Sequence, residues 1–215
     1  NLPTGLTAAL TRDRTSPRGV LEVDEPFLPR VIDAVRPRAV TLLNLSRDQL
    51  DRYAEVRRLA SIWREALQAP AGPTVIANCD DPLVSWAASA AASVVWVSAG
   101  QRWHDDTSVC PACGGVLFRA DSDWWSECGL RRPAPAWRTE GTTVVDGTGV
   151  RHDVQLSVPG AVNVGNAALA AATAAVWGVP AATAFEAMST IATVEGRYLS
   201  TTYDGTPVRL LLAKN

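Results

Sequence analysis

The chain has 215 residues, of which 47% are hydrophobic and 20% are charged, which suits one globular domain carrying an insertion and argues against disorder. Its net charge of −2 argues against a nucleic-acid-binding surface, which is ordinarily basic. No apolar run approaches the roughly 20 residues of a membrane-spanning helix, and residues 1–5 are unlike a signal peptide, so the sequence predicts a cytoplasmic protein without a transmembrane segment.

The first half of the chain alternates apolar runs with helical patterns. Strands are predicted at residues 19–23, 39–43, 74–77 and 93–97. Helices are predicted at residues 24–35 and 52–68 and from Pro82 onward, with Asp81 capping the last of these. Continuous apolar strands separated by helices indicate a mostly parallel sheet that is covered on both faces.

The second half opens with an interruption of this alternation. Residues 104–133 are rich in turn-forming residues and are predicted to form a small inserted module. After it, the sequence predicts a β-hairpin of residues 142–145 and 150–158, helices at 162–177 and 180–191, and strands at 198–203 and 208–213.

Three cysteines gather in the inserted module: Cys110, Cys113 and Cys128. In a cytoplasmic protein such a group indicates a metal site before it indicates disulfides, whereas Cys79 is predicted to be a small buried residue. The run from Cys110 to Gly114 has the pattern of a zinc knuckle, which normally pairs with a second knuckle. The second is incomplete, because Trp125 stands three residues before Cys128 where a cysteine is expected.

The module therefore offers three thiolates for a structural Zn²⁺. A fourth ligand could come from His104, Asp123 or Glu127, or the zinc site could have been lost. A catalytic zinc is not expected, because nothing nearby resembles a site for an activated water.

Lysine is almost absent from the sequence. Of the 20 basic residues, every one is arginine except Lys214. A mechanism that needs a lysine within residues 1–213 is therefore excluded, and a complete phosphate loop of the form Gly-x-x-x-x-Gly-Lys-Ser/Thr does not occur.

Four segments in order resemble motifs of the Mur ligase family. They are Leu42–Tyr53, which looks like its strand-to-helix turn, Ala77–Pro82, Val158–Ala167 and Val194–Tyr198. Gln49 stands where most Mur ligases have a histidine, and this glutamine, together with the cysteine insertion, favours the MurT branch. The resemblance implies an α/β fold in three layers, with a mostly parallel sheet of the P-loop type found in Mur ligase central domains. Residues 1–215 would form that ATP-binding domain without its phosphate-loop segment, with a zinc-ribbon-like insertion at 104–133 and a β-hairpin.

The activity implied by this resemblance is ATP-dependent formation of a carbon–nitrogen bond. MurT proteins activate the α-carboxylate of D-glutamate in lipid II as an acyl phosphate, and ammonia from a GatD-type glutamine amidotransferase then displaces the phosphate. ATP, Mg²⁺ and a structural Zn²⁺ are the implied cofactors, and the inner face of the cell membrane is the implied site of action. Two alternatives remain: a Mur ligase that adds an amino acid, and a non-catalytic zinc-ribbon interaction module.

The resemblance also implies a set of site residues, although it assigns no catalytic residue. Glu22, Asp48 and Gln49 are expected on the magnesium and phosphate side. The expected nucleotide contacts are Asn78, Asn163, Asn166, Arg197 and Lys214, and Cys110, Cys113 and Cys128 are the expected zinc ligands. Each has a simpler explanation, namely a solvent-facing carboxylate, a helix cap or a surface salt bridge.

We further expect Glu22, Asn78 and Asn163 to meet at one cleft. The missing phosphate loop and missing carboxy-terminal domain suggest an excerpt of a longer protein. Such a chain is expected to bind ATP weakly or not at all, because loop amides and a lysine normally hold the phosphates.

Overall fold

The computed structural model describes residues 3–45, 53–102, 107–194 and 198–211. Its helices are α1 (Pro3–Arg12), α2 (Leu28–Val35), α3 (Tyr53–Leu67), α4 (Pro82–Ala88), α5 (Ala161–Ala175) and α6 (Ala181–Ser189), and a 3-10 turn covers Glu25–Phe27. Its strands are β1 (Ala39–Leu42), β2 (Thr74–Asn78), β3 (Val94–Ser98), β4 (Leu117–Ala120), β5 (Asp123–Ser126), β6 (Trp137–Glu140), β7 (Thr143–Val145), β8 (Arg151–Asp153), β9 (Tyr198–Tyr203) and β10 (Thr206–Leu211).

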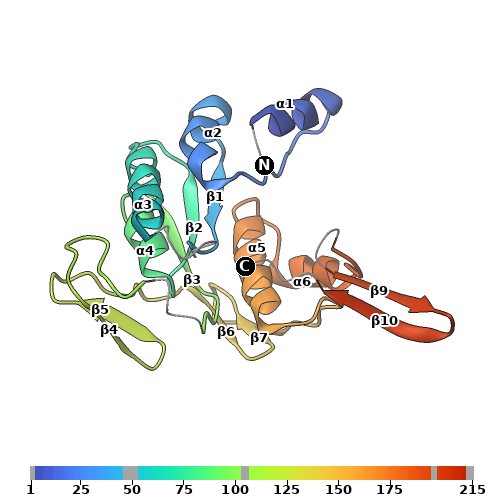
Figure 1. Ribbon diagram of the computed structural model, residues 1–215. Helices are drawn as coiled ribbons and strands as arrows, with labels where there is room; N and C mark the ends of the chain where they lie inside the picture. The colour runs from blue at the N-terminus through green and yellow to red at the C-terminus, as the bar shows by residue number, and fades with distance from the viewer. Residues whose placement is uncertain (1–2, 46–52, 103–106, 195–197, 212–215) are drawn as a thin grey trace.

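The main sheet has six strands in the order β1-β2-β3-β6-β7-β8 (Figure 1). Strands β1, β2, β3 and β6 run parallel to one another. Strands β7 and β8 continue the sheet beyond β6 in antiparallel orientation. The predicted mostly parallel α/β sheet is therefore confirmed. Strand β6 was not predicted, because its four residues Trp137–Glu140 include two charged side chains and give no apolar run.

The strand predicted at residues 19–23 does not form, and residues 18–24 have no regular structure. Part of this run packs beside β1 without pairing to the sheet. Leu21 and Val23 line a cavity beside β1, and Val23 packs against the buried core. Val20, in the same run, is fully exposed. Residues 19–23 are therefore an irregular segment that packs in part against the core, and they do not form a strand of the sheet.

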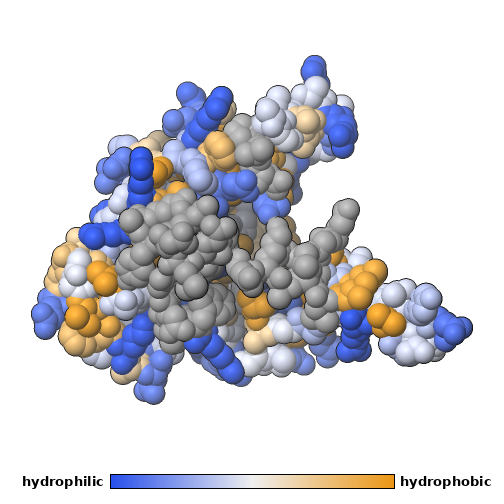
Figure 2. Space-filling view, in the orientation of Figure 1, coloured by the Kyte–Doolittle hydropathy of each residue, from blue (hydrophilic) through white to orange (hydrophobic). Residues whose placement is uncertain are grey.

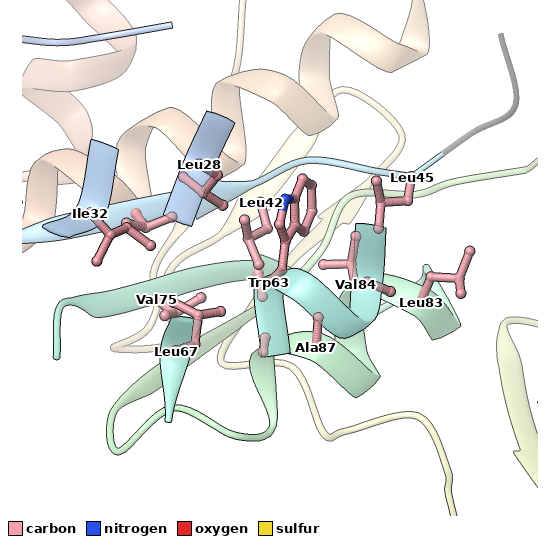
Figure 3. Packing of buried hydrophobic residues seen from close by; sticks show 14 of the residues in the cluster. Leu28, Ile32, Leu42, Leu45, Trp63, Leu67, Val75, Leu83, Val84 and Ala87 are labelled. Carbon is pink, nitrogen blue, oxygen red and sulfur yellow. The ribbon is translucent and has the colours of Figure 1, made fainter. Parts of the chain in front are cut away.

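Helices cover both faces of the sheet, because side chains along each strand point alternately to opposite faces. Val75 and Ala77 of β2 belong to a core formed with α2, α3 and α4, as Figure 3 shows for Val75. Ile76, between them, belongs to a second core formed with α5 and α6. The apolar stripe predicted for α3 faces the first core, where Trp63 donates from Nε1 to the carbonyl of Glu25 at 2.9 Å. The three layers follow directly from these two cores.

Two antiparallel hairpins lie outside the main sheet, at opposite ends of the molecule in Figure 1. The β9–β10 hairpin projects beside α6, and the β4–β5 hairpin belongs to the inserted module. Figure 2 shows hydrophobic surface over this module, where Val116 and Phe118 are exposed. Among the helices of the described residues, none is long and apolar enough to span a membrane.

The β7–β8 hairpin turns at Asp146, as the sequence predicts, and this carboxylate is expected to stabilise the fold. It accepts hydrogen bonds from the backbone of Thr148 and Val150, and its Oδ2 lies 2.8 Å from His152 Nε2. Burial raises the pKa of Asp146, but the hydrogen bonds from His152 and Thr148 outweigh burial and hold the pKa below its usual range. The stabilisation is therefore present above about pH 4 and lost as the pH falls further.

We expect Asp146→Ala to lower the free energy of unfolding by about 2 kcal/mol at pH 7, because several hydrogen-bond donors of the hairpin lose their buried acceptor. Urea unfolding at pH 7 and at pH 3 measures this, and the difference between variant and wild type should shrink at the lower pH. Asp153→Ala, at an exposed carboxylate of the same hairpin, is the control and should change little. Equal losses of unfolding free energy in Asp146→Ala and Asp153→Ala would contradict the stabilising role of Asp146.

Candidate functional site

A cleft of about 100 Å³ lies where the first three parallel strands end. Leu43 and Asn44 follow β1, Asn78 ends β2, and residues 99–102 follow β3, while Ala161, Val162, Asn166 and Leu169 contribute from α5. The carboxyl edge of an open parallel sheet is where such folds place ligands, because successive loops converge there. The strand order thus brings together the side chains that a ligand at this edge would meet.

Asn78 connects two of these loops. Its Nδ2 donates to Oε1 of Gln101 at 3.0 Å, and its Oδ1 accepts from the backbone N–H of Asp80 at 3.1 Å. The side chain is almost wholly buried, so both ends of the amide are held in a fixed orientation. Gln101 was not predicted as a site residue, and its position three residues after an apolar strand was the available indication.

Asp80 holds the loop after β3 in place through hydrogen bonds. Its Oδ2 accepts from the backbone N–H groups of Gly100 (2.8 Å) and Gln101 (3.1 Å). Its Oδ1 accepts from the hydroxyl of Ser98 and from two guanidinium nitrogens of Arg132, at 3.1 and 2.7 Å. No local pattern connects Arg132, 52 residues away in the chain, with this loop.

The neighbouring residues of this loop have structural roles that the sequence predicted. Asp81 accepts from the backbone N–H groups of Leu83 and Val84, which confirms it as the cap of α4, and it also accepts from Leu45 N at 2.7 Å. Cys79 is buried, and burial together with the nearby Asp80 raises the pKa of its thiol to about 12. Cys79 is therefore an inert packing residue at neutral pH.

Of the other residues predicted to contact the nucleotide or magnesium, only some line this cleft. Asn166 lines the cleft with Asn78, but Asn163 does not, and its Nδ2 donates to the carbonyl of Pro159 at 2.7 Å. Glu22 is exposed and lies outside this cleft, because the strand that was expected to position it is not formed. The structure therefore does not bring Glu22, Asn78 and Asn163 together at one cleft, as was expected from the sequence. Asp48, Gln49, Arg197 and Lys214 lie outside the described residues.

The inserted module brings its three cysteines together. The sulfur atoms of Cys110, Cys113 and Cys128 all lie within 4.8 Å of one another, and all three thiols are free of disulfides. Two tight turns position them. Gly114 N donates to the carbonyl of Cys110, and Gly129 N donates to the carbonyl of Ser126. Both glycines have φ in the left-handed region, at +78° and +90°, which other residues rarely adopt.

The fourth side of this cysteine cluster is occupied by Ser126. Its hydroxyl oxygen lies 3.7 Å from the sulfur of Cys113, and the residue is buried. Trp125, at the position where the sequence pattern expects a cysteine, points outward and stacks on Phe118 with ring centroids 5.9 Å apart. Two of the proposed fourth ligands, Asp123 and Glu127, are not part of the cluster of metal-ligating groups, and His104 lies outside the described residues.

The cluster has the donor chemistry of a zinc site. The N–H of Gly115, followed by the contacts of Cys128 and Ser126, lowers the pKa of Cys113 to about 7. The pKa of Cys128 is raised although the N–H of Leu130 lowers it, because the neighbouring Cys113 disfavours a second negative charge. A divalent cation among three sulfurs would remove this repulsion, and soft thiolates are the ligands that Zn²⁺ prefers in structural sites.

Comparisons with known proteins agree with the fold and with the sequence motifs. No family model matches the chain. A pseudomurein peptide ligase type C from Methanothermus fervidus has the same fold, with a TM-score of 0.68 and 22% sequence identity over 86% of this chain and 40% of that chain. The fold is thus one that a peptide ligase uses.

The resemblance to MurT is confirmed by curated relatives. The MurT subunit of lipid II isoglutaminyl synthase from Staphylococcus aureus (strain COL) is 27% identical over 147 residues, which cover 61% of this chain and 33% of that protein. The MurT subunit from Streptococcus pneumoniae (strain ATCC BAA-255 / R6) is 32% identical over 87 residues, which cover 39% of this chain and 20% of that protein. The matched regions span a third or less of these relatives.

Proposed function

We propose that the chain is the nucleotide-binding part of an ATP-dependent carbon–nitrogen ligase of peptidoglycan synthesis. The observation that supports this most directly is the cleft at the carboxyl edge of the sheet, which Asn78, Gln101 and Asn166 all line. An amide side chain both donates and accepts hydrogen bonds, as the edge of an adenine base requires. The likeness to MurT subunits, which their names describe as parts of a lipid II isoglutaminyl synthase, supports the class of reaction.

The reaction would proceed by activation of a carboxylate. A carboxylate is a poor electrophile, so phosphorylation by ATP supplies a leaving group that ammonia can displace to form an amide. Mg²⁺ would neutralise the phosphate charge, and Glu22, Asp48 and Gln49 remain the proposed residues on that side. Arg197 and Lys214 remain proposed phosphate-side contacts, since a guanidinium fork suits phosphate oxygens.

The substrate and partner follow from the same likeness. We propose the D-glutamate α-carboxylate of lipid II as the group that is amidated, with ammonia from a GatD-type glutamine amidotransferase subunit. The relatives' names, which describe a glutamine-hydrolysing synthase with subunits, support both assignments. Lipid II is membrane-bound, so such an enzyme would work in the cytoplasm at the inner face of the membrane. The three cysteines of the inserted module would hold a structural Zn²⁺.

Titration of the chain with adenosine, followed by NMR, tests the base-binding cleft. We expect weak binding, with chemical-shift changes centred on the amides of Asn78, Gly100, Gln101 and Asn166. Asn166→Ala should weaken binding by about fivefold, because one hydrogen-bonding group contributes on the order of 1 kcal/mol. Asn163→Ala is the comparison variant, and the hydrogen bond of Asn163 to Pro159 predicts a smaller loss. Changes that cluster away from this cleft would overturn the proposed function.

A further inference from the structure

The inserted module is attached to the sheet at the loop that follows β2. Trp124, which is 1% exposed, donates from Nε1 to the carbonyl of Cys79 at 3.0 Å. Arg132, which follows β5, forms an ion pair with Asp80 at 2.7 Å, with the two side chains only 12% and 9% exposed. The module is therefore joined to residues adjacent to Asn78 through two buried contacts, and it cannot be a loosely tethered appendage.

Hydrogen bonds connect this ion pair to the residues of the cleft. The carboxylate of Asp80 holds Arg132 on one oxygen and the backbone N–H groups of Gly100 and Gln101 on the other. Gln101, positioned in this way, accepts the hydrogen bond from Asn78. A continuous chain of hydrogen bonds thus runs from the module to two amide side chains of the cleft.

We propose that Arg132 is a positioning residue for the base-binding cleft, through which the cysteine module holds Gly100, Gln101 and Asn78 in place. The proposal rests on the proposed function for its ligand, but its mechanical part concerns this chain alone. A buried carboxylate needs its countercharge, because an unpaired buried charge is strongly unfavourable. Without Arg132, the Asp80 carboxylate would draw in water, and its hydrogen bonds from the two backbone N–H groups would weaken.

Amide hydrogen exchange of the Arg132→Gln variant tests the mechanical part. We expect exchange at Gly100 and Gln101 to quicken by about tenfold or more, since these amides lose a well-held acceptor. Exchange in β7, which lies two strands away from β3 in the sheet, should not change, and Trp124 should keep the module docked. Arg132→Lys, which keeps the charge but not the forked geometry, should restore protection in part. Arg131→Gln is the matched control, because Arg131 is an exposed neighbouring arginine that does not line the cleft.

Adenosine titration of the same variants tests the link to the ligand. Arg132→Gln should weaken binding by about fivefold to tenfold, and Arg131→Gln should bind as the wild type does. Unchanged exchange at Gly100 and Gln101 in Arg132→Gln would overturn the positioning role, whatever the ligand. If exchange changes but the wild type shows no binding in this cleft, the positioning role stands and the proposed function fails.

Discussion

The Ser126→Cys variant is expected to bind Zn²⁺ at least about tenfold more tightly than the wild type. Its new sulfur would stand where the hydroxyl of Ser126 now lies, 3.7 Å from the sulfur of Cys113. Structural zinc sites are almost always tetrahedral with four protein ligands, and the wild-type cluster supplies three thiolates. A serine hydroxyl is a poor ligand for Zn²⁺, so replacing it with a thiolate completes the site without moving the backbone.

Trp125→Cys is the decisive comparison for this prediction. The zinc-knuckle pattern places the missing ligand at residue 125, three before Cys128, whereas the structure turns Trp125 outward onto Phe118. A thiol at position 125 is therefore expected to leave zinc affinity unchanged. Cys113→Ser, which removes one of the three thiolates, should lower zinc affinity by a similar or larger factor than Ser126→Cys raises it.

Competition with a chromophoric chelator measures the affinities of these variants, and Co²⁺ substitution reports how many thiolates bind the metal. The sulfur-to-metal charge-transfer absorption should increase in Ser126→Cys relative to the wild type and remain unchanged in Trp125→Cys. A larger gain from Trp125→Cys would show that the sequence pattern locates the fourth ligand better than the structure does. A wild-type chain with no measurable zinc affinity would contradict the proposed structural zinc.

The two knuckle turns differ in length, and this difference places residue 126 beside the cysteines where the motif count expects residue 125. In the first turn, Cys110 N donates to the carbonyl of Gly115, five residues ahead, but in the second turn Ser126 N donates to Leu130, four residues ahead. The second turn is therefore one residue shorter, and the side chain at position 126 points inward in place of that at position 125. A motif counted in residues assumes equal turn lengths, and only backbone hydrogen bonds reveal the difference.

The fold was predictable wherever a local pattern determined the element. The apolar runs of β1, β2 and β3, the stripe on α3 and the Asp81 cap all carry their structural reason within a few residues. What the sequence could not predict depends on distant partners. Residues 19–23 have the composition of a strand, but β-pairing needs a neighbouring edge and not only apolar side chains.

The candidate site divides in the same way. Asn78 and Asn166 were predicted because they belong to short motifs, one at the end of a strand and one in the first two turns of a helix. Arg132 was not, because its partner Asp80 is 52 residues earlier in the chain. Among 19 other basic residues, nothing local distinguishes an arginine that fills a buried ion pair from one on the surface.

Gly165→Ala is expected to destabilise the protein and to distort the cleft, although the same change usually stabilises a helix. Replacing glycine by alanine inside a helix ordinarily gains up to about 1 kcal/mol. Here α5 packs directly against the loop after β3, and a Cβ on Gly165 would overlap the carbonyl oxygen of Ala99 and lie 3.1 Å from its Cβ. The overlapping atom belongs to the backbone, which cannot rotate away as a side chain can, so helix and strand must separate.

The steric cost of that separation decides whether Gly165→Ala stabilises or destabilises the protein. Overpacking in a close-packed interior costs about 1–3 kcal/mol and can cost more against backbone, so we expect a net loss of about 2 kcal/mol. For a chain of this size that corresponds to a melting temperature lower by about 4–8 °C. Gly5→Ala is the matched control, because Gly5 is also helical, in α1, and a Cβ there meets nothing within 4 Å.

Calorimetry of both variants measures this difference, and adenosine titration shows whether the cleft has moved. Ala99 is bonded to Gly100, whose N–H is one of the two that Asp80 holds, so displacing Ala99 disturbs the backbone that positions Gln101. Gly165→Ala should therefore weaken adenosine binding even at temperatures where the variant is fully folded. If Gly165→Ala proved as stable as Gly5→Ala, the close approach of α5 to the end of β3 would be wrong. The cleft defined by Asn78 and Asn166 would then need a different geometry, because Asn166 stands on α5 and Asn78 is hydrogen-bonded to Gln101, two residues after Ala99.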